Sequence, residues 1–201
     1  MLGIPVGLAY ANAAEWLIHR YVLHGLGKKK SSFWNFHWGE HHRASRKQGF
    51  FDPDYQRSPL GNHAQGKEFL AVAGLLVMHA PLFAVAPFFT ASVWYSGLNY
   101  LRVHRKAHLD PAWAKQHLKH HYDHHMGLDQ DKNWGVTHAW FDRLLGTRVD
   151  YEYDENGRVK KPGAAPAVPQ RTAPAHVGGE DLGATLARDA SNDQDKSKSA
   201  A

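Results

Sequence analysis

Cysteine is absent from the 201 residues of this chain. Disulfide bonds and thiolate metal sites are therefore excluded, and any metal ion must be held by histidine, aspartate or glutamate. Histidine, in contrast, occurs 16 times. Neutral imidazole is a good ligand for transition metals near pH 7. The composition thus makes histidine the first candidate for a metal ligand.

Charge is absent from a long internal stretch, because residues 69–101 contain no Asp, Glu, Lys or Arg. This run is longer than the roughly 20 residues that one membrane-spanning helix needs, and somewhat short for two full spans. Pro81 and Pro87 lie near its middle, where they would break or kink a continuous helix. We expect a helical hairpin whose ends extend past Lys67 and Arg102. One long kinked helix is the alternative.

The first 14 residues also lack charge, and the apolar character continues to Leu23. We expect a first membrane helix over about residues 2–23, with Glu15 and His19 near one end. The alternative is an amphipathic core helix of a soluble protein.

Aromatic residues are absent beyond Tyr153, and the sequence after about Lys161 is rich in Ala, Pro, Gly, Ser, Asp and Lys. Such a segment cannot bury enough apolar surface to offset the entropy lost on ordering. We expect one folded membrane domain over residues 1–155 and a disordered tail over residues 156–201.

The net charge of +5 raises the question of nucleic-acid binding, but no nucleic-acid module is recognisable. The basic residues instead flank the apolar segments, as the positive-inside rule and anionic headgroups favour. We expect a multi-pass integral membrane protein that binds no nucleic acid and has its flanking segments on the cytoplasmic face. These basic residues are Lys28, Lys29, Lys30, Arg43, Arg46, Lys47, Arg102, Arg105 and Lys106.

Ten histidines form four clusters, two before residue 50 and two after residue 100. One metal ion needs only a few ligands, so ten indicate two metal ions. The two halves can share a site only if the apolar run returns the chain to the same membrane face, which favours the hairpin. The clusters are His19-x4-His24, His37-x3-His41-His42, His104-x3-His108 and His117-x2-His120-His121.

Helical spacing suggests how these side chains converge, because residues three or four apart share a face of an α-helix. His117, His120 and His121 span an arc of about 100° and are expected to bind one ion together. His104 is stacked on His108 in the same way, and His37 on His41. His42 points about 100° away from His41, so it is expected to serve the second ion.

The first cluster does not fit a regular helix, because His19 and His24 lie about 140° apart at 3.6 residues per turn. Either the helix ends near Leu23, assisted by Gly25, or the two histidines serve different ions. Glu15 lies one turn before His19 and is expected either to accept its second imidazole proton or to be an ordinary surface residue.

The order of these clusters resembles the fatty acid hydroxylase/sterol desaturase superfamily of membrane di-metal oxygenases. Residues 15–25, EWLIHRYVLHG, look like the first histidine box of that family. The run from His117 to His121, followed by NWGVT at 133–137 and WFDRLLGT at 140–147, resembles its closing signature. The resemblance covers about residues 10–150.

This resemblance implies an all-α fold, in which multi-pass membrane helices carry a helical cap on the cytosolic face with a histidine-rich di-metal site. The implied metal ligands are the ten clustered histidines. Other residues are expected near the ligands without binding the metal, namely Glu15, His124, His125, Asn133 and Asp142. Iron suits oxygen chemistry because zinc has no redox states, although zinc could occupy the site in isolated protein.

The resemblance also implies oxygen-dependent attack on a C–H bond of a lipid, most like the fatty acid 2-hydroxylases. A carotenoid ring hydroxylase and a sterol-type desaturase or oxidase remain open, as does the choice between hydroxylation and desaturation. No fused cytochrome b5-like segment or dinucleotide fingerprint is recognisable. We therefore expect electrons from a separate cytochrome b5, ferredoxin or reductase. A metal transporter or metal store is the alternative from a different class.

Overall fold

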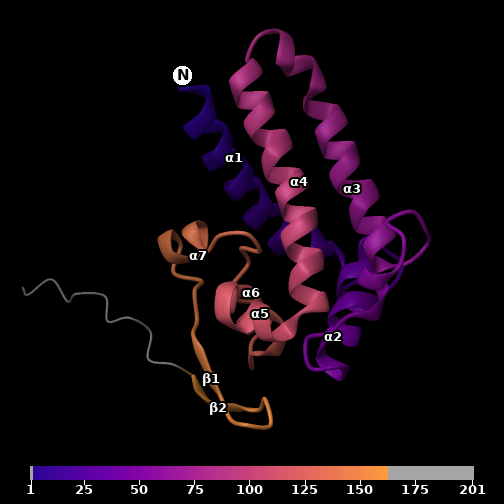
Figure 1. Ribbon diagram of the computed structural model, residues 1–201, viewed down its shortest axis with the longest axis vertical. Helices are drawn as coiled ribbons and strands as arrows, with labels where there is room; N and C mark the ends of the chain where they lie inside the picture. Colours follow the sequence, from indigo (N-terminus) through magenta and orange to yellow (C-terminus); the bar gives the residue numbers. More distant parts are fainter. Residues whose placement is uncertain (1, 163–201) are drawn as a thin grey trace, which may run out of the picture. The chain divides into compact units, whose positions relative to one another are not determined.

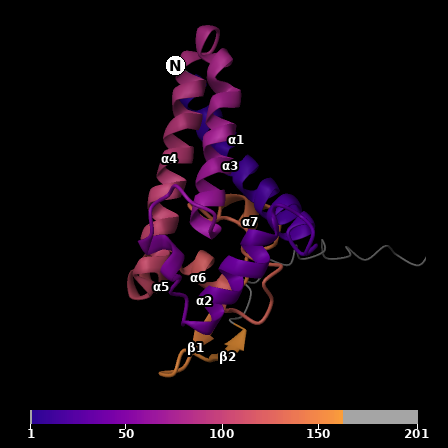
Figure 2. The ribbon, with the colours of Figure 1, turned by 90° about the vertical axis from the view of Figure 1, so that its right-hand side faces the viewer.

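A computed structural model describes residues 2–162 of the chain, which are mostly helical (Figure 1). The expected disordered tail lies, from residue 163 onward, outside the described residues. Three long helices extend together from a region of shorter helices, which we call the cap (Figures 1 and 2).

The three long helices are α1 (Gly3–Leu17), α3 (Ala64–His79) and α4 (Pro87–Leu109). A 3-10 turn, η4 (Ala80–Ala84), reverses the chain between α3 and α4, so the expected helical hairpin is confirmed. Both prolines lie where helices tolerate them. Pro81 is in the turn, and Pro87 is the first residue of α4, where no intrahelical N–H bond is lost.

Helix α4 is the centre of this assembly, because α1 packs along it and α3 also packs against it. Glycines permit the close approach of α1. A Cβ atom at Gly7 would lie 2.8 Å from the carbonyl oxygen of Phe89, and one at Gly3 would lie 3.0 Å from its nitrogen. This is the small-xxx-small pattern by which helices associate in membranes.

Two π-helices follow, and the sequence did not predict them. The first, η1 (Ile18–Leu26), continues directly from α1, and the second, η2 (Phe36–His42), leads into α2 (Arg43–Lys47). Each N–H of a π-helix bonds five residues back, as Gly27 N–H does to the Val22 carbonyl at 3.0 Å. Neither expectation for the first cluster was right, since the helix continues past Leu23 and His19 and His24 belong to the same group of histidines.

The short segments of the cap include the 3-10 helix η3 (Pro53–Gln56), and α5 (Pro111–His117), α6 (Lys119–Met126) and α7 (Trp140–Leu144). The chain breaks between α4 and α5 at Asp110-Pro111, as expected. Asp110 accepts a hydrogen bond from the Trp113 N–H at 3.0 Å and so caps α5. A second break, at Leu118 with φ −129°, separates α5 from α6.

A two-stranded antiparallel hairpin ends the described chain, with β1 (Tyr151–Tyr153) paired to β2 (Val159–Pro162). The expectation of an all-α fold ending at residue 155 is corrected by this hairpin. The local sequence did not predict this hairpin, because contacts with distant parts of the chain hold it in place. The Tyr153 hydroxyl donates to Asp123 on α6 at 3.0 Å, and Tyr151 is buried.

Within the described residues, one helical segment is long and apolar enough to cross a membrane, Ala64–Ala84, comprising α3 and η4. Only a small part of it is buried by the rest of the protein. Large apolar side chains are also exposed on the other two long helices, including Ile4 and Val6 of α1 and Phe88 and Leu98 of α4.

Candidate metal centre

Buried histidines converge into two adjoining groups in the cap. Within each group, one ring nitrogen of every residue lies within 4.8 Å of the others. Every member is at most 3% exposed, so the rings are shielded from bulk water. Group one consists of His19, His24, His37, His42 and His124, and group two consists of His41, His104, His108 and His125.

The π-helices explain the membership of group one. A π-helix has more than four residues per turn, so residues five apart face the same way. His19 and His24 are such a pair on η1, and His37 and His42 are such a pair on η2. The expected pairing of His37 with His41 is therefore wrong, because it assumed an α-helix.

Two members of group two come from one α-helix. His104 and His108 are four residues apart on α4, with their Nε2 atoms 3.2 Å apart. His41 and His125 complete the group, and the Nε2 atom of His121 adjoins it, 3.1 Å from Nε2 of His108. The allocation within the second cluster is thus the reverse of the expectation, with His42 in group one and His41 in group two.

The fourth cluster is shifted by four residues from its expected position. The sequence HLKHHYDHH contains the spacing H-x2-HH twice, at 117–121 and at 121–125. The structure brings the second copy to the metal groups, because His121, His124 and His125 lie on one face of α6. His124 and His125, expected only as neighbours of the ligands, are members of the two groups.

His117 and His120 lie outside both groups, which corrects their expected place among the ligands. The break at Leu118 separates His117 from α6, and its exposed ring contacts the Trp113 carbonyl at 3.0 Å. His120 faces another side of α6, with its Nε2 atom 3.0 Å from the Val136 carbonyl.

Hydrogen bonds at Nδ1 determine which nitrogen is free to bind a metal. The Nδ1 atoms of His19, His108 and His124 contact the carbonyls of Trp134 (2.5 Å), Phe50 (2.8 Å) and Lys132 (2.7 Å). A carbonyl only accepts, so each Nδ1 carries the proton and each Nε2 of a neutral ring presents a lone pair.

The Nε2 atoms of group one face one another at close range. The Nε2 atom of His124 lies 3.1 Å from that of His24 and 3.2 Å from that of His42, and the His19 and His37 Nε2 atoms are 3.0 Å apart. Two unprotonated ring nitrogens at this separation repel unless a cation lies between them. Ligands 2.1 Å from a metal are separated by about 3.0 Å at right angles and about 3.4 Å in a tetrahedron. The spacing therefore fits a bound metal ion.

The protonation state of the imidazoles, and two ring nitrogens that lack hydrogen-bond partners, also indicate a metal site. Burial lowers the pKa of His24, His37, His42, His121, His124 and His125 well below the usual value, so these rings are neutral at pH 7. Within residues 2–162, the buried Nε2 atoms of His41 and His125 have no hydrogen-bond partner. A metal ligand needs just such a neutral, unpaired nitrogen.

Three carboxylates orient histidines from positions that the sequence analysis did not identify. Asp52 accepts from His41 Nδ1 at 2.7 Å, and Glu68 accepts from His104 Nδ1 at 2.5 Å. Asp131 lies 3.3 Å from Nδ1 of His24. Such partners fix the ring orientation and raise ligand basicity. No local spacing connects them to the histidines, so only the tertiary structure identifies them.

Glu15 and Asp142 act on a loop rather than on a histidine. Glu15 accepts from the N–H groups of Val136 (2.5 Å) and Thr137 (2.9 Å), so the expected contact with His19 is absent. Asp142 accepts from the N–H groups of Trp134 (2.8 Å) and Gly135 (2.7 Å). Both carboxylates thereby hold the loop 132–137, which presents two carbonyls to group one.

Backbone strain occurs beside the same carbonyls. Two non-glycine residues within 2–162 have positive φ, namely Phe50 at 81° and Asn133 at 59°. Phe50 provides the acceptor for His108, and Asn133 lies between the two carbonyls that accept from His124 and His19. Positive φ is unusual for a bulky residue, and such strain concentrates at functional sites.

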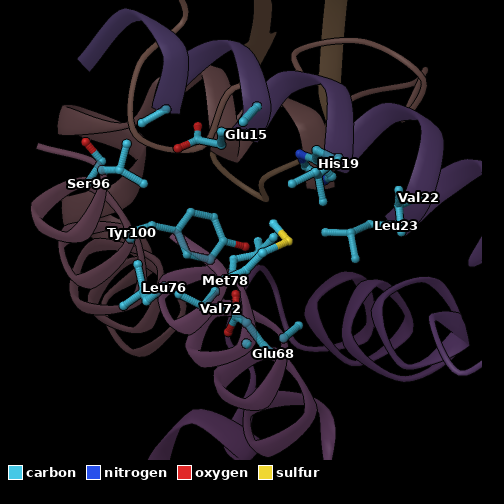
Figure 3. A pocket seen from close by; sticks show the side chains of 18 of the residues that line it. Glu15, His19, Val22, Leu23, Glu68, Val72, Leu76, Met78, Ser96 and Tyr100 are labelled. Carbon is cyan, nitrogen blue, oxygen red and sulfur yellow. The ribbon is translucent and has the colours of Figure 1, made fainter. Parts of the chain in front are cut away.

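An apolar groove of about 560 Å³ leads to group one. It lies between α1 and α3 over α4, and its lining is largely aliphatic and aromatic. Figure 3 shows Glu15, His19 and Leu23 facing Glu68 and Val72 across it. The imidazoles of His19 and His37 form part of its wall, so an apolar molecule in the groove would contact the metal centre.

The comparison with protein families agrees with this geometry. A model of the family described as fatty acid hydroxylase matches residues 4–147, which include both histidine groups and the loop 132–137. The chain therefore belongs to the fatty acid hydroxylase family, and it is an oxidoreductase of the hydroxylase type. No curated protein and no solved structure matches it.

Proposed function

We propose that this protein is a membrane-bound, oxygen-dependent di-iron enzyme that hydroxylates a C–H bond of a lipid, with a fatty acyl chain as the leading substrate. The observation that carries this proposal is the apolar groove, whose wall includes His19 and His37 of group one. An apolar groove selects hydrocarbon, and a ring of neutral imidazoles at its wall places metal chemistry against that hydrocarbon.

In this proposal, group one binds one iron ion, and group two together with His121 binds the other. When bound, iron supplies the redox chemistry that lets O₂ oxidise an unactivated C–H bond. The chain keeps the imidazoles neutral by burial and fixes their orientation through carbonyl and carboxylate acceptors. The groove excludes water from the reacting carbon.

The membrane arrangement is proposed from the exposed apolar surface of α1, α3 and α4. Contiguous apolar surface of this extent is unusual in a soluble protein. The basic residues Arg102, Arg105 and Lys106 lie at the end of α4 nearest the histidines, and Lys28 lies just beyond η1. The positive-inside rule then orients the metal centre toward the cytoplasm.

We also propose a separate electron donor, such as a cytochrome b5, a ferredoxin or a reductase. Residues 2–162 form helices and one small hairpin, with no haem-binding or dinucleotide-binding fold among them. The metal centre in the cap is the part of the chain that such a donor must reach.

Metal content and lipid analysis together test the proposal. Full-length protein purified without oxygen should contain two iron ions per chain, and cells that express it should accumulate a hydroxylated lipid. His42→Ala should lower both, while His138→Ala, which removes an exposed histidine outside both groups, should lower neither.

Other results of the lipid and metal analysis would favour a different substrate, reaction or class of protein. A hydroxylated carotenoid or a modified sterol would change the substrate class, and a new double bond would change the reaction to desaturation. Bound metal with an unchanged lipid and carotenoid profile would reject the enzyme in favour of a metal store or transporter.

A further inference from the structure

The groove has a defined end remote from the metal centre. Among the residues that line it, Tyr10 is the first on α1, His79 is the last on α3, and Val93 is the first on α4. These three positions lie at one level of the helix assembly. At the opposite level lie His19, His37 and Glu68.

A hydrogen bond joins α1 to α3 at that remote end. The Nδ1 atom of His79 contacts the Leu75 carbonyl at 2.7 Å, so Nδ1 carries the proton and Nε2 accepts. The Tyr10 hydroxyl donates to this Nε2 at 3.0 Å. The pair is polar in otherwise apolar surroundings, and intramembrane polar groups are costly unless they have a role.

The groove lining ends at this pair. The ring of Tyr10 packs on Phe89, with centroids 5.3 Å apart, and Phe89 is not part of the groove lining. Just beyond, α1 lies so close to α4 that a Cβ atom on Gly7 would clash with the Phe89 carbonyl. The Tyr10–His79 pair therefore forms the end of the groove lining.

We propose that the Tyr10–His79 pair is the end wall of the substrate groove and limits the length of hydrocarbon that can extend beyond the oxidised carbon. This inference rests on the proposed function. Tyr10 and His19 are nine residues apart on helix, which corresponds to about 14 Å. An extended chain advances about 1.25 Å per carbon, so roughly 11 carbons fit between the metal centre and the wall.

The test measures which chains bind, independently of turnover. Full-length, iron-loaded protein in detergent is equilibrated with an equimolar mixture of saturated fatty acids of increasing length, and the bound fraction is identified by mass spectrometry. Wild-type protein should bind chains up to a limit, beyond which occupancy falls roughly tenfold, because a longer chain would overlap the Tyr10–His79 pair at the end of the groove.

Substitutions at the end wall and in the groove lining should shift the length of the longest fatty acid that binds in opposite directions. Tyr10→Ala removes the wall and should shift the limit to longer chains, whereas Tyr10→Phe keeps the ring and should leave it nearly unchanged. Gly74→Leu should shift it to shorter chains, since Gly74 lines the groove and has open space around its Cβ position. Tyr95→Ala is the matched control, because Tyr95 is an exposed tyrosine on α4 outside the groove.

The outcomes separate the two proposals. A length limit in the wild type that does not move in Tyr10→Ala or Gly74→Leu overturns the end wall and leaves the proposed function intact. A wild-type protein that binds none of the fatty acids overturns the fatty acyl substrate, and the end wall with it.

Discussion

At the scale of single residues, the metal centre depends on what the second nitrogen of each imidazole contacts. In group one, main-chain carbonyls accept from His19 and His124, and the one carboxylate partner, Asp131 beside His24, is exposed. In group two, a carbonyl accepts from His108, and two buried carboxylates accept from His41 and His104. A carboxylate partner makes an imidazole more electron-rich than a carbonyl does. The two metal positions therefore differ in the charge that surrounds them.

The shifted register of the fourth cluster predicts two classes of histidine variant. His124→Ala and His125→Ala each remove a ring nitrogen from a metal group, so iron affinity should fall by at least about tenfold. His117→Ala and His120→Ala are matched controls only four to eight residues away in sequence, and iron content should stay unchanged. Metal analysis of the four purified proteins checks this, and loss of iron in the His117→Ala protein would contradict the register.

Asn133 allows backbone strain to be separated from hydrogen bonding. Alanine and glycine both remove the amide, which accepts from Val149 N–H at 2.7 Å, but only alanine retains the penalty of positive φ. Asn133→Ala should therefore unfold more readily than Asn133→Gly, by about 1 kcal/mol. Thermal unfolding in detergent measures the difference, and equal stability of the two variants would exclude strain at this position.

At the scale of elements, the π-helices determine which side chains share a metal. An α-helical η1 would turn His24 about 140° away from His19, and an α-helical η2 would pair His37 with His41. The wider turn aligns residues five apart instead, so each π-helix contributes two ligands to group one. Such helices are rare and occur frequently at functional sites.

The space around each glycine of the long helices predicts whether a larger side chain is tolerated there. Gly7→Leu forces a side chain into the α1–α4 contact and should destabilise the protein by about 1–3 kcal/mol. Gly74→Leu is the control, since no atom lies within 4 Å of its Cβ position, and its stability should be equal or higher. Unfolding midpoints of both variants in the same detergent provide the comparison. Equal loss in both would mean that α1 does not depend on this contact.

At the scale of the whole molecule, the apolar helices and the histidine-rich cap are segregated. The long helices expose apolar side chains, whereas the cap buries the histidines and carries basic residues on its surface. This segregation is what a membrane boundary between the two parts would require.

The absence of cysteine makes that boundary directly measurable. In sealed inverted vesicles, an impermeant maleimide should label Lys47→Cys, on the cap, and should not label Val85→Cys, at the hairpin turn. Right-side-out vesicles should give the reverse pattern. Labelling of both positions from one side would contradict a hairpin that crosses the membrane.

Much of the fold could be predicted from the sequence, because it depends on long apolar runs and on proline. The charge-free run 69–101 with Pro81 and Pro87 predicted the α3–α4 hairpin, and Asp110-Pro111 predicted the break after α4. The β-hairpin was missed because tertiary contacts hold its tyrosines. The carboxylate partners Asp52 and Glu68 were missed because they are remote in sequence from the rings they orient.

The kind of centre follows from residue order alone. A chain without cysteine, with histidines clustered on both sides of an apolar hairpin, can bind metal only through imidazole and carboxylate, and its box pattern indicates the family. The membership of each metal group required the folded chain. Spacing converts to direction only when the residues per turn are known, and neither the π-helices nor the break at Leu118 is encoded by local spacing. The same applies to the groove and its end wall, since Tyr10 and His79 meet only when α1 and α3 pack on α4.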